Sequence, residues 1–177
     1  MTSYDDIWGF AEDNYGLITA AQAKELGVSN ARLVVMAHRG SLVRVGHGVY
    51  QVKHHVPGEH DGYALGVAAL GKGAYLRGAS VLGLLNFVPT NLSVFYAGSQ
   101  GRVRRQLDVG IHVTENRRIE PCDYFGIPCE PVDVALRSAK EDGALDWDRL
   151  AEAAEKAHEG GFLTDEQLKA FRKEIRG

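Results

Sequence analysis

Apolar residues recur at helical spacing in three short segments near the start of the chain. Residues 4–14 have apolar side chains three or four positions apart and acids in the first turn. Thr19 begins a capping box, which predicts a second helix over 20–26. Ser29 is the expected N-cap of a third helix, over 30–39, and a glycine follows each of these two helices. The last two helices have the outline of a helix-turn-helix.

Two strand-like segments follow the helix-turn-helix. Residues 41–45 and 49–52 are rich in β-branched residues, and Gly46-His47-Gly48 between them has the composition of a hairpin turn. Three helices and a two-stranded wing make a winged helix-turn-helix. We therefore predict a first domain over residues 1–57, with Pro57-Gly58 as the linker after it.

The rest of the chain predicts a mixed domain of helices and strands over residues 58–177. Helical spacing alternates with short β-like runs, and nothing repeats. Helices are expected over 60–71 and 79–86, from about 132, from Asp146 or Asp148 to 158, and from Thr164. Strands are expected over 88–98, 109–115 and, as a short strand or turn, 124–129. The fold class is therefore α+β, an N-terminal winged helix-turn-helix followed by a mixed α/β domain with C-terminal helices.

Charge is unevenly distributed along a chain whose formal net charge is only −3. Four Lys or Arg residues and no acid lie between Glu25 and Glu59, and five lie between Asp61 and Asp108. The bases of the second window are Lys72, Arg77, Arg102, Arg104 and Arg105. Two basic windows in a nearly neutral chain favour a local surface that binds a polyanion such as double-stranded DNA.

The third helix is the predicted recognition helix, because the second helix of a helix-turn-helix places its N-terminal residues in the major groove. Arg32 can bond guanine through two parallel hydrogen bonds, Asn30 can bond adenine, and Val35 can contact a thymine methyl. Basic side chains on the wing are better placed for phosphates, which position the protein without specifying sequence. The predicted DNA contacts of this domain are Thr19, Ser29, Asn30, Arg32, Val35, Arg39, Arg44, His47 and Lys53.

Alternative roles remain open for the recognition helix. Arg32 and Arg39 could be ordinary solvated residues of an amphipathic helix whose Leu33, Met36 and Ala37 face the core. The winged helix could also serve as a protein-docking module, with the acidic C-terminal part binding a partner. A docking module would lack the steep salt dependence that phosphate contacts produce.

A loop in the second domain carries three further arginines. Arg102, Arg104 and Arg105 are predicted to add phosphate contacts beyond the winged helix. A solvated loop, or a loop that faces the acidic C-terminal helices, explains the same residues equally well. Both alternatives stay open on the sequence alone.

Residues 16–52 resemble the N-terminal winged helix of the AbiEi antitoxins, which belong to type IV toxin–antitoxin systems. The matching motifs are Thr19-Ala20-Ala21-Gln22-Ala23, Gly27-Val28-Ser29, Arg39-Gly40-Ser41-Leu42-Val43-Arg44-Val45 and Gly48-Val49-Tyr50. A weaker similarity continues through YLRGASVLGLLNFVP and YFGIPCEPVDVALRSAKE. The resemblance is fairly specific in the first part, because it joins a helix-turn-helix to an Arg-Val-x-x-Gly-Val-Tyr hairpin.

The resemblance implies a transcriptional repressor that is not an enzyme and needs no cofactor. Members of the family bind inverted repeats at the promoter of their own operon, which two copies of the chain would occupy. They counteract a nucleotidyltransferase-like toxin without forming a stable complex with it, and the C-terminal domain is linked to that activity. Gly78-Ala79-Ser80 departs from the more polar helix start of the family, so an orphan regulator without a toxin partner is an alternative.

The sequence contains no motif that indicates catalysis. GVAALGKGAY lacks the spacing of a phosphate-binding loop. Solvated histidines in a linker are expected, rather than a metal site, at His54, His55 and His60. Ordinary surface acids, rather than a nuclease cluster, are expected at Asp108, Glu115, Glu120 and Asp123. We therefore predict no enzyme activity, no metal and no cofactor.

The two cysteines and the hydropathy pattern favour a cytoplasmic protein. Cys122 and Cys129 are expected to be reduced thiols, with a disulfide between them as the weaker alternative. A zinc site with His112 is favoured less still, because it lacks a paired CxxC. No signal peptide and no apolar run of membrane-spanning length is recognised. A membrane is therefore not an expected partner.

Overall fold

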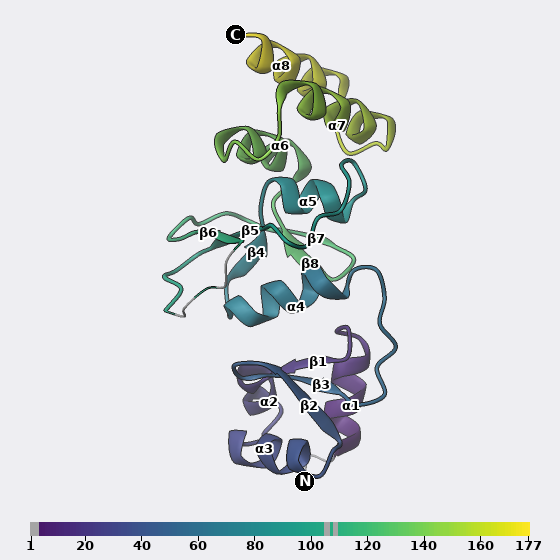
Figure 1. The fold of residues 1–177 in the computed structure, drawn as a ribbon, viewed down its shortest axis with the longest axis vertical. Coiled ribbons are helices and arrows are strands. Elements are labelled where there is room, and N and C mark those ends of the chain that lie inside the picture. The colour runs from purple at the N-terminus through teal and green to yellow at the C-terminus, as the bar shows by residue number, and fades with distance from the viewer. Residues whose placement is uncertain (1–3, 105–106, 108–109) are drawn as a thin grey trace. The chain divides into compact units, whose positions relative to one another are not determined.

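A computed structural model describes residues 4–104, 107 and 110–177, and the chain divides into two compact units (Figure 1). Unit 1 is Met1–Gly71 and unit 2 is Lys72–Gly177. Both contain helices and a sheet, which confirms the predicted α+β class. The domain boundary predicted at 57–58 lies inside unit 1 and stays a prediction about which segment functions by itself.

Unit 1 is a small antiparallel sheet with three helices packed around it, followed by a fourth helix (Figure 1). Its elements are α1 (Tyr4–Glu12), β1 (Leu17–Thr19), α2 (Ala20–Glu25), α3 (Asn30–His38), β2 (Leu42–Gly46), β3 (Val49–Val52) and α4 (Asp61–Leu70). The strand order is β1-β3-β2. Strand β1 was not predicted, because three residues are too few to show a period of two. Its pairing partner is β3, thirty or more positions away in the chain.

The predicted helix caps of the helix-turn-helix are confirmed. The Thr19 hydroxyl accepts a hydrogen bond from the Gln22 backbone N–H, and the Gln22 side chain accepts one from the Thr19 backbone N–H, at 3.2 and 2.9 Å. The Ser29 hydroxyl accepts from the Arg32 N–H at 3.2 Å. Gly27 has φ +78°, a backbone conformation that side chains other than glycine adopt at a cost. These caps set where α2 and α3 begin and how sharply the chain turns between them.

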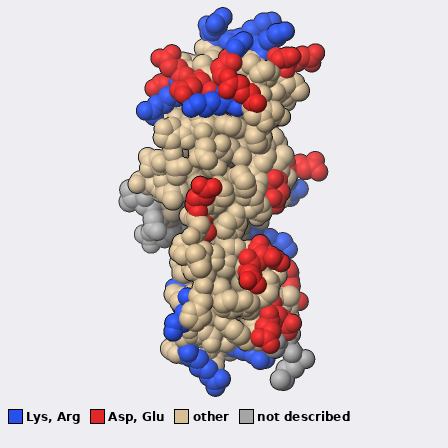
Figure 2. Space-filling view, turned by 90° about the vertical axis from the view of Figure 1, so that its right-hand side faces the viewer, with Lys and Arg blue, Asp and Glu red and all other residues tan. Residues whose placement is uncertain are grey.

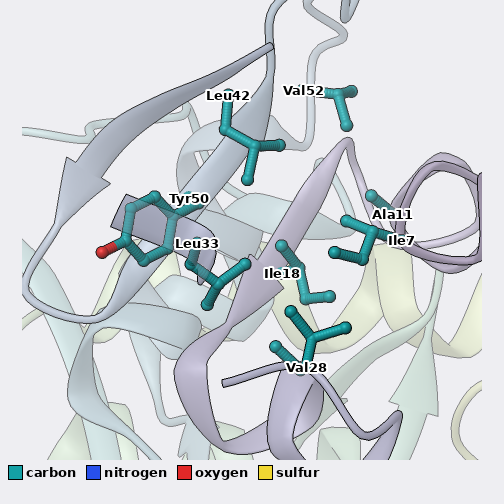
Figure 3. Packing of buried hydrophobic residues seen from close by; sticks show 9 residues of the cluster. Ile7, Ala11, Ile18, Val28, Leu33, Leu42, Tyr50 and Val52 are labelled. Atoms are coloured by element: carbon teal, nitrogen blue, oxygen red, sulfur yellow. The ribbon is translucent and has the colours of Figure 1, made fainter. Parts of the chain in front are cut away.

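One apolar cluster joins all the elements of the winged helix (Figure 3). Leu33 projects from α3 into this cluster and is fully buried, and Met36 and Ala37 pack against it, as the helical spacing predicts. The other buried members are Ile7, Ala11, Ile18, Ala23, Val28, Leu42, Tyr50 and Val52. Contacts from α1, the sheet and the turn before α3 therefore fix α3 by its inner face and leave its outer face free.

Unit 2 is built on a five-stranded mixed sheet of order β6-β5-β4-β8-β7. Its strands are β4 (Ala74–Leu76), β5 (Phe95–Ser99), β6 (Ile111–Thr114), β7 (Cys122–Tyr124) and β8 (Ile127–Cys129). Pairing is antiparallel for β4·β5 and β7·β8 and parallel for β4·β8 and β5·β6. The sequence did not predict β4, and the strand expected over 88–98 is confined to β5.

The helices of unit 2 are α5 (Ala79–Leu84), α6 (Val132–Glu141), α7 (Trp147–Glu159) and α8 (Asp165–Arg176). Helices α5, α6, α7 and α8 contact one another in sequence, forming a stack beside the sheet (Figure 1). Asp146 is the N-cap of α7, because its carboxylate accepts from the Arg149 N–H at 2.9 Å. Thr164 and Gln167 form the second predicted capping box. Within the residues that the structure describes, no helix is long and apolar enough to cross a bilayer.

Candidate nucleic-acid interface

The outer face of α3 carries the residues that the sequence placed there. Asn30, Arg32, Val35 and Arg39 are all exposed, and Val35 retains 45% of its accessible surface. Arg32 lies in the first turn, where the Ser29 cap holds its backbone N–H. The helix therefore presents a polar N-terminal half and an apolar centre on the side away from the core.

A second exposed row on α3 was missed by the sequence analysis. Val34 and His38 lie one helical turn apart and face a groove between α3 and strand β2. From the strand side, Val43 and Arg44 line the same groove, whose volume is about 530 Å³. The signal available in the sequence was the i, i+4 spacing of Val34 and His38, but only the position of β2 shows that this row faces a groove.

The wing carries three of the predicted phosphate contacts on an exposed surface. Arg44 lies on β2, where its Nε donates to the Gly46 carbonyl at 3.3 Å beside a β-bulge. His47 is exposed in the turn between β2 and β3. Lys53 follows β3, is exposed and borders the groove. The Arg44 and Lys53 side chains thus lie on the rim of one groove, although they are nine positions apart in the chain.

Thr19 and Ser29 have structural roles that compete with the predicted DNA contact. The Thr19 hydroxyl accepts a hydrogen bond from the Gln22 backbone N–H and donates one to Gln22 Oε1 at 3.0 Å. Thr19 is half-buried. Ser29 is exposed, and its hydroxyl caps α3. Ser29 can still reach a phosphate through the remaining capacity of its hydroxyl. DNA contact by either residue stays a prediction.

Charge is unevenly distributed over unit 1. In the lower part of Figure 2, most blue Lys and Arg atoms lie along the left and bottom edges, and the red Asp and Glu atoms gather on the right. Helix α3 and strands β2 and β3 contain no acid, whereas α1 contains Asp5, Asp6 and Glu12. Among the described residues, the salt bridges do not involve the cations Arg32, Arg39, Arg44 and Lys53. These four charges are available to an external anion.

The arginine loop of unit 2 is only partly described. Arg102 and Arg104 are exposed, whereas Arg105 lies outside the described residues. The Val103 backbone N–H donates to Glu115 Oε1 at 2.8 Å, which ties the loop to the end of β6. Glu115 is thus a structural partner of this loop. The DNA-contacting role of the three arginines stays a prediction.

Arg77 is buried and does not belong to an exposed basic surface. The sequence analysis counted it among the bases of the second basic window, and that count was wrong for Arg77. Its side chain is 2% exposed and bonds three carboxylates. Nη1 donates to Glu130 at 3.2 Å, Nη2 donates to Glu141 at 2.8 Å, and Nε donates to Asp142 at 3.1 Å. A count of charges along the chain cannot distinguish an exposed arginine from one that β4 carries into the interior.

Glu130 is the most deeply buried charge of this network. Burial raises the pKa of Glu130, while hydrogen bonds from the Gly78 N–H and the Ser138 hydroxyl and the charge of Arg77 partly oppose that rise. For Arg77, burial alone would lower the pKa, but the bonds to Asp142 and Glu141 raise it above its ordinary value. The guanidinium therefore stays charged and organises the acids of α6 around the end of β4.

Several residues considered for metal binding or catalysis are bonded to other groups, and Asp108 lies outside the described residues. His55 Nε2 lies 2.5 Å from Asp61 Oδ2, and the Asp61 carboxylate also accepts from the Gly58 N–H, so both hold the start of α4. Asp123 accepts from the Gly126 N–H in the β7–β8 turn. Across the described part of the chain, no three His, Cys, Asp or Glu residues are grouped so as to hold a metal.

Unit 1 has the helices, the wing and the exposed cationic face of a winged helix-turn-helix. Residues 10–53 match the family model described as "Transcriptional regulator, AbiEi antitoxin", which confirms the resemblance for about a quarter of the chain. This segment is similar to transcriptional regulators of the AbiEi antitoxin type, a family of regulators rather than of enzymes. No curated protein matches the chain.

Proposed function

We propose that this protein is a sequence-specific DNA-binding repressor. The observation that carries the proposal is the outer face of α3 and the wing, which together present four cations and no acid. The family match over residues 10–53 supports the same conclusion. An acid-free face of this kind attracts phosphates by charge and positions the helix for contact with bases.

The residues divide into two groups by the DNA groups that they reach. Asn30 and Arg32 in the first turn of α3 contact base edges in the major groove. Arg44, His47 and Lys53 contact phosphates from the wing. Base contacts give the protein its specificity, and phosphate contacts give it register and most of its salt dependence.

The target that we propose is an inverted repeat at the protein's own promoter. Two copies of α3 on such a repeat require half-sites about one helical turn, roughly 34 Å, apart. A dimer in solution, or two monomers that bind cooperatively, meets this requirement. By binding there, the protein would repress its own operon.

We further propose that unit 2 supports antitoxin activity of the type IV kind. In this mode the protein opposes a nucleotidyltransferase-like toxin without a stable complex. The family description names an antitoxin, which supports the proposal, although the matched residues lie in unit 1. An orphan regulator that binds its promoter and has no toxin partner is the alternative.

A protein-docking module is the second candidate function. The exposed valines of α3 and β2 favour it, because exposed apolar side chains at one surface often bind another protein. Such a module would bind its partner with weak salt dependence. If six phosphates are neutralised over two subunits, DNA affinity should instead fall roughly 10³-fold between 50 and 200 mM salt.

A mobility-shift titration tests the repressor directly. The full-length protein is titrated against the DNA upstream of its own gene, with unrelated competitor DNA present, at several salt concentrations. We expect Arg32→Ala to lower the preference for the operator and Arg44→Ala to lower affinity for all sequences about equally. Binding of the wild-type protein no tighter to the upstream DNA than to the competitor would contradict self-regulation.

A further inference from the structure

Helix α3 and strand β2 of unit 1 carry three exposed valines. Val34 and Val35 on α3 retain 37% and 45% of their surface, and Val43 on β2 retains 49%. Val34 and Val43 line the α3–β2 groove from opposite sides, and Val35 lies on the outer side of α3. The floor of the groove is formed by buried Leu42 and Tyr50. The centre of the proposed interface is therefore apolar.

The charges around the valines decide what covers them. Arg44 and Lys53 line the groove, and Arg32 and Arg39 lie one helical turn from Val35 on either side. Helix α3 and strands β2 and β3 carry no acid. A second copy of the same face would bring these like charges together, which opposes self-association through it. The complementary partner is a polyanion that also exposes apolar groups. In the major groove of DNA, the thymine 5-methyl is the group of that kind.

We propose that Val34 and Val43, in addition to the Val35 that the sequence predicts, are specificity-determining residues that bind thymine methyl groups. Val34 and Val43 would enclose one thymine methyl in the α3–β2 groove. Val35 would contact a second thymine methyl from the outer side of α3. This inference rests on the proposed DNA-binding function and adds to it the chemistry of recognition. The operator half-site should then require thymine at the positions that these valines face.

Replacing thymine by deoxyuridine removes only the methyl group and leaves base pairing intact. The full-length protein is titrated with its upstream operator duplex, in which the thymines of each half-site are replaced one at a time. We expect two positions in each half-site at which the loss of the methyl weakens binding about fourfold, the value of one buried methylene-sized group. Placing 5-methylcytosine instead of cytosine at a neighbouring position serves as a control for an unrelated methyl.

Valine variants assign each methyl to a side chain. The quantity compared is the affinity for the thymine duplex divided by the affinity for the deoxyuridine duplex, called the thymine-to-uracil ratio. Val35→Ala should bring this ratio close to one at a single position. Val34→Ala and Val43→Ala should each bring it close to one at a second position, which the two valines share. Arg44→Ala is the matched control, because it should weaken binding to both duplexes and leave the ratio unchanged. All four side chains are exposed, so equal melting temperatures check that the variants are folded.

The outcomes separate this inference from the function on which it rests. Operator-specific binding with a thymine-to-uracil ratio of one at every position would overturn the role of the valines and leave the repressor intact. Absence of specific binding would overturn both. If Val35→Ala or Val43→Ala changes the oligomeric state in sedimentation and not the ratio, the face is a protein interface and the inference is wrong.

Discussion

At the scale of single residues, Arg77 shows that a buried charge has a different role from an exposed one. The sequence placed it in a basic window, but the end of β4 carries it into contact with Glu130, Glu141 and Asp142. A buried ion pair contributes little net stability compared with apolar residues of the same size, yet removing one partner leaves an uncompensated charge. Arg77 is therefore expected to matter for folding rather than for DNA binding.

We expect Arg77→Ala to destabilise the protein by about 3–5 kcal/mol, because Glu130, which is 0% exposed, would lose its buried counter-charge. Urea unfolding at neutral pH measures the change. Arg117→Ala is the matched control, since Arg117 also bonds Glu141 but is 42% exposed, and it should cost at most about 1 kcal/mol. Equal losses of unfolding free energy for the two substitutions would show that the buried ion pair contributes no more than the exposed one.

The same variant should lose less stability at acidic pH. A carboxyl group whose folded pKa is raised contributes stability below its unfolded pKa and loses that contribution as pH rises through the folded pKa. Removing Arg77 raises the pKa of Glu130 further and relieves the lowering of the Glu141 pKa. Both changes make the destabilisation by Arg77→Ala smaller at pH 5 than at pH 8. A destabilisation that grows on acidification would contradict this role of Glu130.

The two cysteines should differ in reactivity. Burial raises the pKa of the Cys129 thiol and keeps it out of solvent, whereas Cys122 opposite it in the β7–β8 hairpin is half-buried. We expect iodoacetamide to alkylate Cys122 in the folded protein and Cys129 only after denaturant is added. Mass spectrometry of a time course measures this, and simultaneous alkylation of both thiols would show that the hairpin opens.

At the scale of elements, short helices depend on their caps. Helix α2 has six residues and α3 has nine, so neither is stable without its cap and its packing. The Thr19 box and the Ser29 hydroxyl satisfy the first N–H groups of these helices. The buried face of α3 and its Ser29 cap hold the helix in place. The position of the exposed outer face therefore depends on the packing and on the cap.

Thr19→Ala and Ser29→Ala should each cost about 1 kcal/mol of unfolding free energy. We expect Ser29→Ala also to weaken operator binding, because the first turn of α3 carries Asn30 and Arg32. Thr164→Ala is the matched control, since it removes a capping box of the same kind from α8 in unit 2. Urea unfolding and mobility shifts on the three variants measure the two effects separately. Weaker operator binding by Thr164→Ala would show that lost stability alone explains the effect.

At the scale of the whole molecule, the net charge of −3 conceals a localised cationic face. Among the described residues, the four cations of α3 and the wing form no salt bridge, whereas many cations of unit 2 already bond acids: Arg77, Arg117, Arg137, Lys156 and Arg172. Affinity for DNA should therefore follow particular cations rather than their total number.

The salt dependence of binding should identify these cations. Lys53→Ala should reduce the slope of log affinity against log salt by about 0.9, the value for one phosphate contact. We expect the double variant Arg102→Ala/Arg104→Ala to reduce the slope further, as the predicted loop contacts require. Lys169→Ala on α8 is the control and should leave the slope unchanged. If the double variant leaves the slope unchanged, the loop arginines do not contact phosphates and the loop is solvated.

Local features of the chain were sufficient to predict much of unit 1. The Thr19 and Thr164 boxes, the Ser29 cap and the inward face of α3 depend on residues within four positions of each other. Short-range spacing therefore specifies where these helices begin and which side chains turn outward. The family resemblance of residues 16–52 rests on the same local motifs and agrees with the match over residues 10–53.

Only the tertiary structure decided which distant residues meet. Strands β1 and β4 are three residues long and exist because β3, β5 and β8 pair with them. The burial of Arg77 depends on acids more than fifty positions away, and the groove that joins Val34 to Val43 depends on how β2 packs against α3. Local sequence encodes backbone preferences, whereas burial and pairing arise from contacts between segments that the sequence keeps apart.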